Sequence, residues 1–521
     1  MLYERLHWLD YIVVLFYFSI IVYIGAYVSR KQKSTDAYFA GNRSLPAWAV
    51  GMSLMATLIS SVTFLAYPGQ GFNGNWILLV QGLMVPVVLL IIIWFIVPMY
   101  RRIIGLSAYE YFEKRFGYFA RLYGSLAFVM AHFTKMGSVF YLLALALASM
   151  TGMNTYHVIL VVGTVTIFYT LIGGIEAVIW TDVIQGFILI GGGFICVVLL
   201  LLRPEQGSAA VIQTAWENGK MSMGPYDWSF TRLTFWVMAI NGIFYAIQKY
   251  GTDQTIVQRF LLAKSDSKAV KAALMGALMC VPIWALFIFI GTLLWVFYST
   301  TAAQLPAGVT GDKVFPYFIM SQLPAGVTGL ILAALIAAAM SSLDSDLNCL
   351  AAVGVEDYYR RFNTNATDKK CLNLGKIIVI VSGLCSIGIA CLYVHLGGEA
   401  ILGTIFALYA IFSGGIAGLF ALGFLTVRTN RKGLYIGIAA CVLFTAYALL
   451  TSTKFDLGGS EKRQLLDLGR FNFTAHKYML GVYSHIVLFV VGYLASFLFK
   501  PDRDTKELTL YGWLAGRRAD N

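Results

Sequence analysis

The stretch AAAMSSLDSDLN, residues 337 to 348, gathers hydroxyl and carboxylate side chains at the end of a long apolar run. On a helix that turns about 100° per residue, Ser341, Ser342 and Ser345 share one face, and Asp344 and Asp346 flank it on opposite sides. A serine at such a place is often bonded only to its own helix or to a neighbouring one. A carboxylate at membrane depth costs at least about 2.5–3.5 kcal/mol and needs a cation, a proton or a paired base. Because Lys and Arg are absent from residues 314 to 359, no partner lies nearby in the sequence.

Two further segments place oxygen atoms inside apolar runs. In GGIEAVIWTDVIQG, residues 173 to 186, the glycine pair Gly173 and Gly174 predicts a helix break. Asp182 then lies inside the next span as a functional carboxylate, or it is only a helix cap or an interfacial carboxylate. In MATLISSVTF, residues 55 to 64, four hydroxyl side chains predict that a second span is broken: Thr57, Ser60, Ser61 and Thr63. Backbone that leaves the helix at membrane depth must line a cavity or be buried in protein. Carbonyl, hydroxyl and carboxylate oxygens together indicate a seat for a small hard cation.

Two other polar residues stand within apolar spans. Lys135, in AHFTKMGSVF, either extends to the membrane interface or contacts an anionic solute. Gln81, in NWILLVQGLM, either joins two helices or forms a polar wall of a solute site.

The elements that must position these residues are membrane spans. The 521 residues are 59% hydrophobic and only 12% charged, against about 25% charged in soluble proteins. A span needs about 20 mostly apolar residues. This length predicts an all-α membrane protein of about thirteen spans, near residues 9–28, 46–65, 76–99, 122–149, 157–173, 178–202, 233–250, 270–298, 318–350, 376–396, 400–425, 434–451 and 478–498. We expect no soluble domain and only short helices around residues 203–232 and 452–477.

The distribution of basic residues predicts the orientation. Most of the 38 lysines and arginines fall in alternate loops, which are cytoplasmic if the N-terminus is outside. One such segment holds Lys249, Arg259, Lys264, Lys268 and Lys271. The net charge of +12 therefore indicates topology rather than nucleic-acid binding. Seven cysteines without CxxC spacing and six histidines without metal spacing indicate neither a disulfide framework, nor a zinc site, nor an enzyme.

These segments resemble the sodium/solute symporter family, which includes sodium–galactose, sodium–sialic acid and sodium–monocarboxylate symporters. The resemblance covers about residues 8 to 500 and is most specific in GGIEAVIWTDVIQG, SSLDSDLN and DQTIVQRFLLAKS. It implies a single transmembrane domain with the leucine-transporter type of fold, in which two inverted repeats contain five helices each. The implied parts are an extra helix at 9–28, repeats at 46–202 and 233–425, two added helices within 434–498, and a cytoplasmic tail at 499–521.

The resemblance also implies the cation ligands. A common sodium site would use backbone oxygens of Ala56, Ile59 and Ala338 with the hydroxyls of Ser341 and Ser342. A second sodium, held by some members, would lie among Asp182, Ser341, Asp344 and Ser345. Asp344 departs from the family, several members of which have Ser or Thr there. It could tighten a sodium site or hold a proton, since neighbouring like charges raise a pKa, so the sodium stoichiometry stays open.

The implied solute site is closest to that of the sialic acid symporters. Its residues would be Thr57, Ser60, Ser61, Thr63, Gln81, Lys135, Asp253 and Gln254. Lys135 stands where such a transporter has an arginine. The lysine keeps the positive charge but cannot make the bidentate contact of a guanidinium with a carboxylate. The lysine expected in a galactose symporter is absent, because Leu278 and Met279 occupy its place.

The sequence therefore predicts a secondary active transporter rather than an enzyme. It would move sodium together with a small organic solute, with an acidic sugar such as sialic acid ahead of the alternatives, which are a neutral sugar (glucose, galactose or inositol) and a monocarboxylate. Na⁺ is the expected ion, and the solute and the lipid bilayer are the expected partners, with no nucleic acid. We expect a monomer in the plasma (bacterial inner) membrane, with the N-terminus outside and the C-terminus in the cytoplasm.

Overall fold

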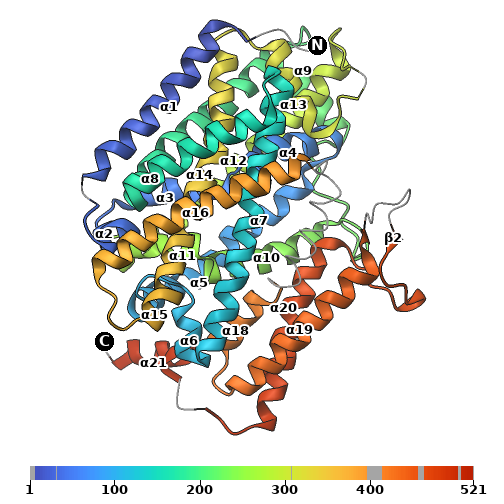
Figure 1. The fold of residues 1–521 in the computed structure, drawn as a ribbon. Helices are drawn as coiled ribbons and strands as arrows, with labels where there is room; N and C mark the ends of the chain where they lie inside the picture. Colours follow the sequence, from blue (N-terminus) through green and yellow to red (C-terminus); the bar gives the residue numbers. More distant parts are fainter. Residues whose placement is uncertain are drawn as a thin grey trace.

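The structure is a computed structural model that describes residues 6–30, 32–306, 308–395, 414–455, 463–502 and 506–519. These residues form a bundle of long helices, and α1 begins at the end of the bundle opposite to α21 (Figure 1). The strands among them are β1 (Lys454–Phe455) and β2 (Arg463–Gln464), which pair antiparallel in a small hairpin. The predicted all-α architecture is confirmed for this part of the chain.

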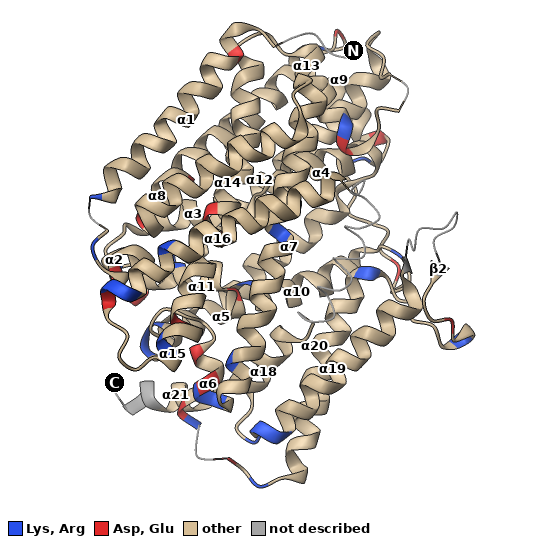
Figure 2. Ribbon diagram, viewed as in Figure 1, with Lys and Arg blue, Asp and Glu red and all other residues tan. Residues whose placement is uncertain are grey.

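Nine helices in the described ranges are long and apolar enough to cross a membrane. They are α1 (Trp8–Ser29), α5 (Leu79–Ile103), α7 (Tyr118–Thr151), α8 (Thr155–Leu202), α12 (Asp266–Thr300), α14 (Val327–Val353), α16 (Asp368–His395), α19 (Arg431–Ser452) and α20 (Lys477–Ala495). A tenth span is the bent pair α3 (Ala47–Leu58) and α4 (Ser61–Asn73). Lysines, arginines and acidic residues lie mainly near the ends of these helices, and few lie in the middle of a helix (Figure 2).

The shorter elements connect the spans. The α-helices are α2 (Thr35–Ala40), α6 (Glu110–Phe116), α9 (Ser208–Glu217), α10 (Phe235–Thr252), α11 (Gln254–Leu262), α13 (Val314–Gln322), α15 (Arg360–Phe362), α18 (Ile416–Leu425) and α21 (Leu510–Ala519). The 3₁₀ turns are η1 (Gly41–Arg43), η2 (Trp76–Leu78), η3 (Gly311–Lys313), η5 (Gly469–Phe471), η6 (Ser496–Leu498) and η7 (Lys506–Leu508). A π-helical segment, η4 (Gly354–Tyr359), extends α14.

Two predicted spans, 157–173 and 178–202, form the two halves of α8. They are separated by a sharp kink at Gly174, where φ is +57° and ψ is −157°. Glycine is required there, because a side chain strains such a backbone and a Cβ atom would lie 2.8 Å from the Tyr38 carbonyl oxygen. The predicted glycine break is therefore confirmed as a kink. The predicted spans 233–250 and 400–425 correspond to α10 and to α18, although residues 400–413 of the latter lie outside the described residues.

The predicted break in the second span is confirmed, since α3 and α4 meet at an angle of 60°. Ile59 and Ser60 both have extended backbone angles between the two helices. After the bend, α4 continues to Asn73 although it contains Pro68. Its glycines allow close packing on α12: a Cβ atom on Gly71 would lie 2.2 Å from the carbonyl oxygen of Ile288.

The predicted span 318–350 is divided in the structure, because α13 ends at Gln322 and α14 begins at Val327. Pro324 and Gly326, the latter with φ +84°, prevent a continuous helix. The first turn of α14 is capped from α1, where Asp10 Oδ1 accepts from the backbone N–H groups of Gly326 and Gly329 at 2.7 Å each. The helix α14 then runs through the centre of the bundle (Figure 1). Of the most apolar 18 residues of this span, 89% are buried.

Candidate cation and solute site

The bend between α3 and α4 lies against the middle of α14. Ser341 Oγ donates to Ala56 O at 3.0 Å, with Ala338 O as a second acceptor at 3.3 Å. Ser342 Oγ donates to Thr57 O at 3.3 Å. These contacts and the adjacent bend residue define the bend cluster, which consists of Ala56, Thr57, Ile59, Ala338, Ser341 and Ser342. Two segments 285 residues apart thus meet inside the bundle, as the resemblance to the symporter family implies.

The bend cluster contains oxygen atoms and no charged group. Ala56, Thr57 and Ala338 contribute carbonyl oxygens beside the two serine hydroxyls, and Ile59 is fully buried at the bend itself. Uncharged oxygens suit a monovalent hard cation, which the carbonyl dipoles and hydroxyl lone pairs can coordinate without an ion pair. The residues present therefore fit Na⁺.

A second polar group lies on the side of α14 that faces α8. Tyr169 OH donates to Asp344 Oδ2 at 2.5 Å, and Ser345 Oγ lies 3.3 Å from Asp344 Oδ1. Ser53 of α3 donates through a short hydrogen bond to Asp182 Oδ2. With the arginine described next they define the acid cluster, which consists of Ser53, Tyr169, Asp182, Arg259, Asp344 and Ser345. Every one of these side chains is buried.

Arg259 of α11 connects the two sides of the acid cluster. Its Nη2 lies 2.6 Å from Ser345 Oγ and 3.2 Å from Asp182 Oδ2, and its Nε donates to Ser53 Oγ at 2.9 Å. Its Nη1 donates to the carbonyl oxygen of Thr255 at 2.6 Å. The guanidinium is 0% exposed, so it stands among the predicted ligands of the second sodium as a cation that belongs to the chain.

Contrary to the prediction, Arg259 lies not in an exposed loop but on the buried helix α11, whereas the cytoplasmic side of this segment stays a prediction. All nine residues of α11 are buried, because this short helix is inserted among the spans instead of lying on the surface. A signal was present in the sequence: Arg259 is flanked by Ile256 and Val257 on one side and by Phe260 on the other, unlike the more polar surroundings of Lys268. Acids in neighbouring spans also required a buried cation from elsewhere.

The acid cluster has one more acid than it has bases. With Asp182 and Asp344 ionised, Arg259 balances only one of the two charges, and Asp182 Oδ1 has no hydrogen-bond partner among the described residues. Buried charges need to be paired. The cluster can therefore take one further monovalent cation.

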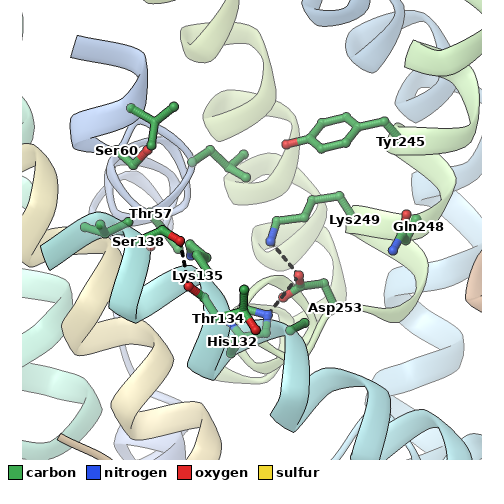
Figure 3. A pocket seen from close by; sticks show the side chains of 14 residues that line it. Thr57, Ser60, His132, Thr134, Lys135, Ser138, Tyr245, Gln248, Lys249 and Asp253 are labelled. Carbon is green, nitrogen blue, oxygen red and sulfur yellow. Dashed lines mark hydrogen bonds and ion pairs between the residues drawn. The ribbon is translucent and has the colours of Figure 1, made fainter. Parts of the chain in front are cut away.

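Beside the bend cluster lies a cavity of about 480 Å³ (Figure 3). Its walls come from the bend, from α7, from α10 and from the residue after α10. Four of the predicted solute-binding residues line it, and Figure 3 shows them converging from these elements: Thr57, Ser60, Lys135 and Asp253. Its volume lies within the range of about 300–1,000 Å³ that is usual for small-molecule sites.

The other four predicted solute-binding residues do not line this cavity. Ser61 and Thr63 are buried on α4, and Gln81 accepts from Asn241 Nδ2 at 3.0 Å, in a contact between α5 and α10. Gln254 is fully buried; its Nε2 donates to Leu106 O and its Oε1 accepts from the N–H of Ala108 at 2.8 Å. The amide of Gln254 is thus used to hold the loop before α6.

A charged chain runs along the wall of the cavity and links its two lysines. Lys135 Nζ lies 3.1 and 3.0 Å from the two carboxylate oxygens of Asp346. His132 Nδ1 is 2.8 Å from Asp346 Oδ1, and its Nε2 is 3.5 Å from Asp253 Oδ2. Lys249 Nζ closes the chain at 2.5 Å from Asp253 Oδ2. Figure 3 shows the part from His132 to Lys249.

Sequence reasoning did not select His132, Lys249 or Asp346 for this site. His132 was counted only among histidines without metal spacing, yet it lies three residues before Lys135, on the same helix face. Asp346 turns away from the bend cluster toward α7, on the opposite side of α14 from Asp344, as the helical spacing predicts.

The model of the sodium:solute symporter family matches residues 38–440 of this chain. The sodium/sialic acid symporter NanT of Aliivibrio fischeri is 31% identical over 504 residues, which are 96% of this chain and 95% of that protein. The sodium/sialic acid symporter SiaT of Proteus mirabilis is 30% identical over 505 residues, which are 96% and 97% of the two chains. These relatives are transporters, and they match nearly end to end.

A solved structure is similar over the same extent. It shows a sodium-coupled sialic acid symporter in a substrate-bound, outward-open state, with a TM-score of 0.86, 29% identity, and coverage of 96% of this chain and 99% of the other. The predicted fold class is therefore confirmed, whereas the boundaries of the two repeats stay a prediction.

Proposed function

Because the chain belongs to the sodium:solute symporter family, we propose that it takes up an acidic sugar of the sialic acid type together with sodium. The observation that carries the proposal is the position of Thr57. Its carbonyl oxygen accepts from Ser342 in the bend cluster, its Oγ1 lies 3.1 Å from Ser345 in the acid cluster, and it lines the cavity. Thr57 thus connects the two candidate cation-binding sites to the candidate solute site.

Sodium in the bend cluster would hold the end of α3 against α14. Its ligands would be the oxygens of Ala56, Ile59, Ala338, Ser341 and Ser342. A cation bound there favours the conformation in which both helices are in contact, and this conformation fixes the Thr57 wall of the cavity. Loss of sodium would release α3 and, with it, the solute.

The energy for uptake comes from the ion. Each sodium that moves inward across 100 mV supplies about 2.3 kcal/mol, and a second sodium in the acid cluster would double this. In this proposal the N-terminus lies outside and the C-terminus in the cytoplasm. The repeats at 46–202 and 233–425 would rock against each other around the fixed seats.

The cavity chemistry supports an acidic sugar. Lys135 supplies an ammonium group for a carboxylate, and Thr57, Ser60, Thr134 and Ser138 supply hydroxyl groups for those of a sugar. The predicted sites at Ser61, Thr63, Gln81 and Gln254 are not needed for this contact.

A neutral sugar is the second candidate, and one observation favours it. Both cavity lysines are already paired with protein carboxylates, Lys135 with Asp346 and Lys249 with Asp253. The cavity wall is thus nearly balanced in charge. The experiment must therefore compare charged with neutral solutes.

Purified full-length chain in proteoliposomes tests the proposal. With an inward Na⁺ gradient and a negative interior, we expect accumulation of radiolabelled N-acetylneuraminic acid, and none when K⁺ or choline replaces Na⁺. Lys135→Met should abolish uptake of the acid while sodium binding remains. Saturable uptake of galactose or a monocarboxylate in place of the acid would contradict the proposed solute, and uptake equal in K⁺ would contradict sodium coupling.

A further inference from the structure

Asp346 holds the one ammonium group that the proposed function assigns to the solute. Its two oxygens lie 3.1 and 3.0 Å from Lys135 Nζ, and it is itself 0% exposed. Lys135, in contrast, keeps 30% of its side chain exposed and lines the cavity. The ammonium group therefore faces a buried protein carboxylate on one side and the solute space on the other.

The position of Asp346 is fixed from a second direction. His132 lies 2.8 Å from its Oδ1 and reaches Asp253, which is held by Lys249 and caps α11 through Thr255 N at 2.9 Å. The carboxylate thus cannot follow Lys135 into the cavity without breaking this chain. Lys135, with four flexible methylene groups, is the partner that can move.

We propose that Asp346 is an internal competitor of the substrate carboxylate for Lys135. This inference rests on the proposed function. Binding of an acidic solute is then an exchange of carboxylates: Lys135 leaves Asp346 and pairs with the solute, and it returns to Asp346 when the solute departs. Asp346 thereby weakens binding, promotes release and keeps Lys135 paired while the empty transporter reorients.

The size of the effect follows from the fraction of Lys135 that is free. A solute that needs a minor state binds more weakly in proportion to the population of that state. A lysine that is free about one tenth of the time lowers the apparent affinity about tenfold. The competition affects only solutes that bear a carboxylate.

Asp346→Asn tests the exchange, because asparagine keeps an acceptor for His132 and removes the charge. Equilibrium binding is measured on the purified full-length protein with N-acetylneuraminic acid and with its uncharged methyl ester. We expect about tenfold tighter binding of the acid and unchanged binding of the ester. Net uptake of the acid should fall in the same variant, because release and return of the empty transporter become slow.

A matched background separates competition from a packing effect. In Lys135→Met the further change Asp346→Asn should tighten binding of the acid far less than it does in the unaltered chain, since no ammonium group remains to compete for and only the repulsion between the two carboxylates is removed. If Asp346→Asn does not fold, Asp346→Ser gives the same comparison with a smaller neutral side chain.

The outcomes distinguish the two proposals. Acid binding that Asp346→Asn leaves unchanged, or that changes as much as ester binding, overturns the competitor role alone. Failure of the unaltered chain to bind the acid overturns the proposed solute and the inference with it.

Discussion

The bend cluster and the acid cluster lie on neighbouring parts of α14, but their buried polar groups are paired in different ways. In the bend cluster, Ser341 and Ser342 face backbone carbonyl oxygens, and no charged group takes part. In the acid cluster, the guanidinium of Arg259 contacts Asp182 and Ser345, and Asp344 lies beside Ser345. Thr57 touches both, through its carbonyl oxygen and its hydroxyl.

The two clusters should therefore depend on an exchangeable ion to different degrees. Neutral oxygens can bind and lose a sodium ion with little change in folding, because their hydroxyls donate to the carbonyls when no ion is bound. Buried ionised carboxylates need a cation or a proton, because an uncompensated buried charge is costly. We therefore expect changes in the bend cluster to alter transport and changes to Arg259 to alter folding.

The largest expected effect comes from Arg259→Met, which removes the guanidinium and keeps most of the apolar volume. Asp182 would lose its ion pair and Ser345 a donor, so we expect a loss of about 3–5 kcal/mol in the free energy of unfolding. Thermal or denaturant unfolding in detergent measures this loss.

A second substitution provides the control for that experiment. In Arg259→Met combined with Asp182→Asn, the orphaned charge is gone, and we expect at least half of the lost stability to return. A loss below about 1 kcal/mol in Arg259→Met alone would mean that the guanidinium is not the counter-ion of the cluster.

The next effect in size is that of Ser342→Ala on sodium. Loss of one proposed ligand oxygen should raise the half-saturating sodium concentration about tenfold or more, which corresponds to ~1.4 kcal/mol. The free energy of unfolding should change by no more than about 1.5 kcal/mol, the usual contribution of one hydrogen bond. Sodium-dependent uptake and unfolding of the same preparation give both values.

Ser386→Ala is the matched control for that variant. Ser386 is equally buried on α16, and its hydroxyl donates to the carbonyl oxygen of Ser382. It belongs to neither cluster, so its sodium dependence should equal that of the unaltered chain. An equal shift in both variants would mean that lost packing, not a lost ligand, explains the effect.

The contrast between the clusters also explains which parts of the site could be predicted from the sequence. The two parts of the bend cluster were predictable because each is local: a run of hydroxyls that breaks one helix, and serines that share a face of another. That these parts meet was implied only by the resemblance to the symporter family. The kink at Gly174 was predictable for the same reason. Asp344 and Asp346 were separated correctly by helical spacing alone.

What the sequence did not reveal depends on contacts between distant elements. Arg259 was assigned to a loop because burial of α11 is decided by the spans around it. His132 and Lys249 became site residues only when α7 and α10 were placed beside each other. Gln254 was assigned to the solute site by the family resemblance, but whether an amide faces a cavity or a backbone is decided by helix rotation.

The smallest expected effect tests whether the acid cluster also holds an exchangeable cation. In Asp344→Asn the side chain still accepts from Tyr169, but the excess negative charge beside Arg259 is gone. If a second sodium supplies the missing charge, the sodium dependence of uptake should lose its cooperativity and the half-saturating concentration should shift only about threefold, because the bend cluster is intact. Sodium titrations of uptake at fixed membrane potential measure both. An unchanged, cooperative sodium dependence in Asp344→Asn would place the second ion outside the acid cluster and leave Arg259 as the cation that balances this cluster, while the bend cluster keeps the first ion.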